Sequence, residues 1–110
     1  MKRVVICLAL SGCAHAYWIP TKTPTKYTGT REVDADTLAK ISGLDYLIWG
    51  YFDRSTGIAY VLNTVPERAK PCIRAHEKYH AGFDHGPERL EFIDCGNGSW
   101  LSTETIQRIE

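Results

Sequence analysis

The chain has 110 residues, a length that suits one small domain. Its composition, with 44% hydrophobic and 24% charged residues, is that of a folded globular protein and not of a disordered one. The 13 basic and 13 acidic side chains balance, so the chain lacks the basic surface that nucleic-acid binding requires. We therefore expect no nucleic-acid partner.

The first residues, MKRVVICLALSGC, have the pattern of an export signal. Two basic residues, Lys2 and Arg3, precede an apolar run over residues 4–10, and small residues then lead to Cys13. The apolar run is too short to span a bilayer as a helix. An alternative interpretation is that VVICLAL forms a buried first strand of a cytosolic protein.

The LSGC string that ends at Cys13 resembles the lipobox of bacterial lipoproteins. The resemblance implies a lipoprotein signal peptide at residues 1–12, cut before Cys13, which then carries fatty acyl chains such as palmitate. Ala14 stands where the inner-membrane retention signal of that family has an aspartate. The resemblance thus implies a cell-envelope protein, anchored by lipid in the outer membrane and facing the periplasm.

Export would also determine which cysteines can form a disulfide. Cys7 lies in the signal segment and Cys13 at the lipid site, which leaves Cys72 and Cys95. An oxidising compartment favours a disulfide between these two. The alternative is two separate buried thiols.

Residues 13–30 predict a lipid-anchored tether, because threonines, two prolines and the lack of helical periodicity favour extended backbone. Trp18 has two open interpretations: it rests in the membrane interface, or it packs on the domain as part of an extra strand. Residues 31–110 are predicted to form the domain.

The domain is predicted to begin with a short helix over residues 34–42, with Asp34 as its N-cap and Gly43 at its C-terminal end. A β-hairpin signal follows, with strands at 45–53 and 58–65 joined by a turn at 54–57. A second helix is predicted from Pro71, a residue type favoured in the first helical turn, to about Gly82. Together these elements predict the α+β class.

This second helix carries the string HEKYH at residues 76–80. Residues four apart lie on one helix face, so the imidazoles of His76 and His80 can reach one tetrahedral zinc ion. Glu77 is one residue round the helix, close enough to accept a proton from water at the metal. The alternative is an amphipathic helix with no metal, whose two histidines are half-buried.

The H-E-x-x-H string resembles that of the zincin superfamily of metallopeptidases. The resemblance implies that His76 and His80 bind zinc, that Glu77 is the general base, and that the β-hairpin packs on the active-site helix. The chain also resembles bacterial and phage lipoproteins that combine a lipobox with this string.

A third ligand is expected to be His85, which follows the glycine turn at Gly82. In the metzincin branch, the glycine and the third histidine stand three and six positions after the second histidine. Here they stand two and five positions after His80, one residue short. Glu91 and Glu88 are the alternative third ligands, since gluzincins use a glutamate.

Two functions remain open at this point. The first is a membrane-anchored zinc metallopeptidase that hydrolyses peptide bonds of a peptide or protein substrate, with Glu77 as general base. The alternative is a non-catalytic lipoprotein of the cell envelope, in which zinc stabilises a structural or binding domain.

Overall fold

The computed structural model describes residues 18–85, 92–96 and 100–102. The predicted signal peptide, Cys13, Glu88 and Glu91 lie outside these residues. Chain order gives β1 (Trp18–Pro20), β2 (Gly29–Val33), α2 (Ala35–Ser42), β3 (Gly50–Asp53), β4 (Ile58–Leu62), a 3-10 turn (Glu67–Ala69), α3 (Lys70–Tyr79), β5 (Phe83–His85), β6 (Phe92–Asp94) and β7 (Trp100–Ser102). The described part of the chain is a mixed α+β domain, which confirms the predicted class.

The largest described sheet has the order β2-β4-β3. β3 and β4 pair antiparallel, with Phe52 opposite Ala59, which confirms the predicted hairpin. Its first strand is shorter than predicted, because residues 45–49 form a loop and pairing begins at Gly50. β2 adds to β4 in parallel and therefore includes Gly29 and Thr30, which we had assigned to the tether.

Both predicted helices form. The side chain of Asp34 accepts a hydrogen bond from the Thr37 N–H at 2.8 Å, and Gly43 closes α2 in the left-handed conformation. α3 ends at Tyr79, earlier than predicted. The next three residues, 80–82, form a tight turn in which each N–H bonds to the carbonyl three residues back, and β5 begins directly after it at Phe83.

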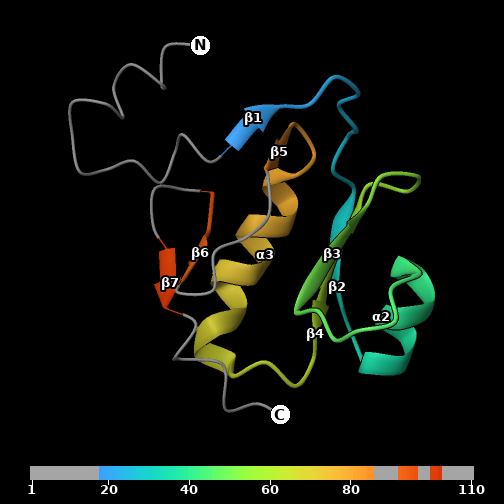
Figure 1. The fold of residues 1–110 in the computed structure, drawn as a ribbon, viewed down its shortest axis with the longest axis vertical. Coiled ribbons are helices and arrows are strands. Elements are labelled where there is room, and N and C mark those ends of the chain that lie inside the picture. Colours follow the sequence, from blue (N-terminus) through green and yellow to red (C-terminus); the bar gives the residue numbers. More distant parts are fainter. Residues whose placement is uncertain (1–17, 86–91, 97–99, 103–110) are drawn as a thin grey trace.

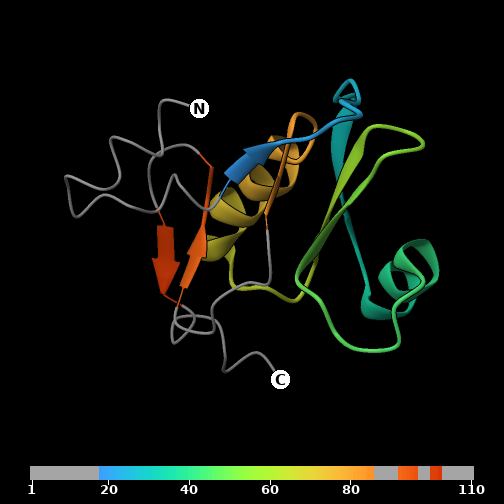
Figure 2. The same ribbon diagram turned by 45° about the horizontal axis from the view of Figure 1, so that its top comes forward.

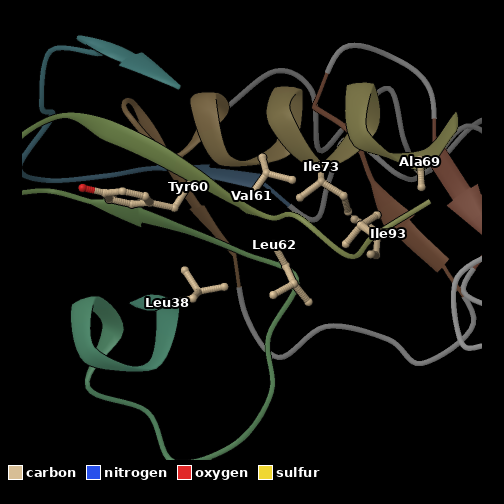
Figure 3. Close-up of a cluster of buried hydrophobic side chains, with 8 residues drawn as sticks. Leu38, Tyr60, Val61, Leu62, Ala69, Ile73 and Ile93 are labelled. Carbon is tan, nitrogen blue, oxygen red and sulfur yellow. The ribbon is translucent and has the colours of Figure 1, made fainter. Parts of the chain in front are cut away.

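α3 lies between the three-stranded sheet and the β6–β7 hairpin (Figures 1 and 2). Ile73 of α3 packs with Val61 and Leu62 of β4 and with Ile93 of β6 in one buried cluster (Figure 3). A disulfide joins Cys72 of α3 to Cys95, which confirms the predicted bridge. Both sides of α3 are therefore fixed, one by apolar packing and one by a covalent link.

β1 pairs antiparallel with β5, so that Trp18 lies opposite His85. Of the two interpretations of Trp18, the structure therefore supports the extra strand: the side chain is packed on the domain and only 2% exposed. No helix in the described ranges is long and apolar enough to cross a membrane.

Candidate metal centre

Three histidines meet where α3 is followed by β5. His76 lies in α3, His80 caps the C-terminal end of this helix one turn later, and His85 is the last residue of β5. One ring nitrogen of each lies within 4.8 Å of those of the other two. The structure thus brings together all three histidines that the sequence analysis selected, in a group that could hold a metal ion.

The spacing of the nitrogens suits a small tetrahedral ion. The Nε2 atoms of His76 and His85 are 3.3 Å apart. Two imidazole nitrogens bound to tetrahedral zinc at about 2.0–2.1 Å must themselves be about 3.3 Å apart, by simple trigonometry. One edge of the expected tetrahedron therefore already has the required length, and a ring nitrogen of His80 lies within 4.8 Å of those of His76 and His85.

Backbone carbonyls select the tautomers of the two helical histidines. Nδ1 of His76 lies 2.7 Å from the carbonyl oxygen of Asp94, and Nδ1 of His80 lies 3.0 Å from that of Phe83. A carbonyl can only accept, so in each neutral ring Nδ1–H is the donor. The lone pair of each ring is then on Nε2, the form in which histidine binds metals.

Burial also keeps the His80 ring neutral. Burial, followed by positive charge on His76 and on His85, lowers the pKa of His80 from 6.5 to about 3. A neutral imidazole is the form that binds a metal, so acid does not compete for this ligand at ordinary pH.

The shifted pKa predicts that the metal-free protein is less stable in mild acid. As the pH falls below 6.5, His80 gains a proton in the unfolded chain while in the folded chain it stays neutral down to about pH 3. The unfolded state then binds more protons, so the free energy of unfolding falls by up to about 1.4 kcal/mol per pH unit. Urea unfolding at pH values on either side of 6.5 measures this loss. If His80→Gln lost the same amount of unfolding free energy in acid as the wild type, the effect would not come from His80.

Trp18 forms an apolar wall behind the three histidines. Its ring centroid lies 5.0 Å from those of His76 and His80 and 4.9 Å from that of His85. Because it is almost fully buried, Trp18 keeps water from this side of the group. No local pattern connects a residue of the predicted tether with this site, because the link depends on the pairing of β1 with β5.

A cavity of about 420 Å³ lies beside the histidines. Glu77 lines it and is only 7% exposed. Gly50 of β3 makes room for this carboxylate, since a Cβ there would lie 2.8 Å from Cγ and Oε2 of Glu77. The lining residues are Leu44, Ile48, Gly50, Tyr51, Phe52, Arg54, His76, Glu77, His80, Asp84 and His85.

Arg54 is a further charged group of this cavity, which we had assigned only to the hairpin turn. Its Nη2 pairs with Oδ1 of Asp84, and that carboxylate oxygen is 4.0 Å from Nδ1 of His80. Asp84 therefore lies beside His80, where the ion pair with Arg54 holds it. No local signal identifies Arg54, because only the fold brings the hairpin turn to Asp84 of β5.

The assembled site has three histidine nitrogens, the carboxylates of Glu77 and Asp84, and an adjoining cavity that Trp18 does not line. Glu88 and Glu91, the alternative third ligands, lie outside the described residues. Comparison of the chain with protein-family models, with curated proteins and with solved structures finds no match.

Proposed function

We propose that this protein is a zinc-dependent peptidase with a zincin-like site, anchored in the cell envelope through lipid on Cys13. The observation that carries the proposal is that the carboxylate of Glu77 lines the same cavity as the three converging histidines. Three protein ligands leave a fourth position open, the arrangement of catalytic zinc sites, whereas structural sites are closed by four.

The chemistry divides between the metal and the chain. A zinc ion held by His76, His80 and His85 would supply Lewis acidity, which makes water reactive at neutral pH. Glu77 would accept the proton of the attacking water at its carboxylate and donate it to the leaving nitrogen as the peptide C–N bond breaks. Trp18 would limit access of bulk water from the opposite side.

The cavity wall suits an extended peptide. β3 is an edge strand of the described three-stranded sheet, and its Gly50, Tyr51 and Phe52 line the cavity. The free edge of a strand binds a peptide through main-chain hydrogen bonds. Leu44 and Ile48 line the cavity from the preceding loop, in which Tyr46 and Leu47 are exposed, so apolar side chains of a substrate would find partners there.

Metal content is the first test. We expect one zinc per chain in the purified disulfide-bonded protein, measured by mass spectrometry. His80→Ala should lose the zinc, because only two histidine ligands remain. Lys78→Ala, at an exposed position on the same helix, should keep the zinc. A metal-free wild-type protein after incubation with zinc would overturn the proposal.

The zinc-loaded protein should then cleave members of a peptide library, and a chelator should stop the cleavage. If zinc binds with this stoichiometry and no peptide is cleaved, the alternative of a zinc-stabilised structural domain is supported instead.

A further inference from the structure

The disulfide and two of the metal-site histidines share one face of α3. Cys72, His76 and His80 follow one another at intervals of four residues, so they lie one turn apart along the helix. Cys72 is bonded to Cys95, the residue that directly follows β6, with their Cα atoms 4.9 Å apart. The bridge therefore anchors a second segment of chain one turn away from His76.

That second segment supplies the hydrogen-bond acceptor of His76. The Nδ1 atom of His76 lies 2.7 Å from the carbonyl oxygen of Asp94, and both residues are buried. This carbonyl belongs to the planar peptide unit that ends at the Cα of Cys95. The direction in which the oxygen points therefore depends on where the disulfide holds Cys95.

The turn after β6 is fixed by further contacts. The Oδ1 atom of Asp94 accepts a hydrogen bond from the Gly96 N–H at 2.8 Å. Gly96 has a positive φ of 88° and packs closely on Tyr79 of α3, because a Cβ at this glycine would lie 2.9 Å from the Cβ of Tyr79. Covalent, polar and steric contacts thus hold the same short segment against α3.

We infer that the Cys72–Cys95 disulfide positions His76 for metal binding through the carbonyl of Asp94, so that the high-affinity metal site exists only in the oxidised chain. Asp94 is a positioning residue in this arrangement. The inference rests on the metal site of the proposed function. It deepens that proposal by making metal loading depend on the redox state of the protein.

His80 provides an internal comparison. Its Nδ1 bonds to the carbonyl of Phe83, only three residues further along the chain, within the turn that joins α3 to β5. That acceptor has no covalent connection to the disulfide. Reduction should therefore release the ring of His76 from its tautomer while the ring of His80 keeps its own.

The redox step requires a dithiol reductant. Two thiols of the reductant are oxidised to a disulfide, and the Cys72–Cys95 bond is reduced to two thiols, so two electrons and two protons pass to the protein. Reduction gives each sulfur its own proton and removes the covalent restraint on Cys95.

The test compares the full chain with and without a dithiol reductant. Zinc affinity is measured by competition with a chromophoric chelator, and the ring tautomers by two-bond proton–nitrogen NMR of the zinc-free protein labelled at histidine. We expect reduction to weaken zinc binding by about 10- to 100-fold, as for the loss of other groups that orient metal ligands. We also expect the His76 ring signals to lose their Nδ1–H pattern while those of His80 do not.

A pair of glycine variants with the disulfide intact covers the case in which the reduced chain unfolds. Gly96→Ala should push the Asp94–Cys95 segment away from Tyr79 and weaken zinc binding. Gly43→Ala is the matched control, since Gly43 also has a positive φ, 75°, but a Cβ there meets nothing within 4 Å. Only the first variant should change zinc affinity and the His76 signals.

The outcomes separate this inference from the proposed function. If the reduced, folded chain binds zinc as tightly as the oxidised chain, or if the two glycine variants bind it equally, the inference is wrong while the metal site stands. If no form binds zinc, the proposed function fails, and the NMR comparison still decides whether the disulfide controls the ring of His76.

Discussion

Glu77→Gln is expected to lower the rate of peptide hydrolysis by about 10²- to 10⁴-fold, the usual contribution of a general base, and to leave one zinc bound per chain. Glutamine has nearly the same shape as glutamate, so it should fill the space beside Gly50 without moving β3. Its amide cannot accept the proton of water. Rates on one cleaved peptide and zinc content on the same sample measure the two effects.

A matched carboxylate and a ligand variant make this result specific. Glu67→Gln makes the same chemical change at a side chain that is 87% exposed and pairs with Lys70, away from the cavity, so its rate should equal that of the wild type. His80→Ala should lose both zinc and activity. Hydrolysis by Glu77→Gln at the wild-type rate would remove Glu77 from the mechanism and leave the metal site in place.

Trp18→Ala is expected to destabilise the metal-free protein by about 3–5 kcal/mol, the range for large aromatic side chains in a core. The indole is 2% exposed and has ring contacts with Tyr79 and with all three histidines of the site. Its loss leaves a cavity behind the metal site and weakens the attachment of β1 to β5. Urea unfolding monitored by circular dichroism measures the loss, since tyrosine or tryptophan fluorescence would change with the substitution.

Two further variants define what Trp18 contributes. Trp18→Phe retains an aromatic ring and should lower the free energy of unfolding by less than Trp18→Ala. Ile19→Ala alters the next residue of the same strand, where the side chain is 57% exposed, and should stay within about 0.5 kcal/mol of the wild type. If Trp18→Ala lowered the free energy of unfolding as little as Ile19→Ala, then β1 would not be part of the stable domain.

The sequence predicted the elements whose signals are local. Asp34 and Gly43 identify α2 because capping chemistry is decided by neighbouring backbone groups. The histidines of the HEKYH string could be paired because helix geometry alone places residues four apart on one face. The disulfide could be predicted because few cysteines remained once the amino-terminal ones were assigned.

The remaining parts of the site depend on contacts between distant segments. Asp94 reaches His76 because β6 packs on α3, and Trp18 reaches it because β1 pairs with β5. His85 was predicted to follow a turn at Gly82, and the structure has this turn; what the sequence did not predict is that β5 then carries His85 back to the helix. This turn accommodates a spacing that is one residue shorter than in the metzincin string.

The docking of β1 also sets how far the site can be from a membrane. Trp18 is five positions after Cys13, and a fully extended chain covers at most about 18 Å over that length. If Cys13 carries lipid, as the lipobox predicts, the three histidines are confined to a thin layer above the bilayer. Such confinement would favour partners that are themselves bound to the membrane, because both would share a small volume and meet at a high effective concentration.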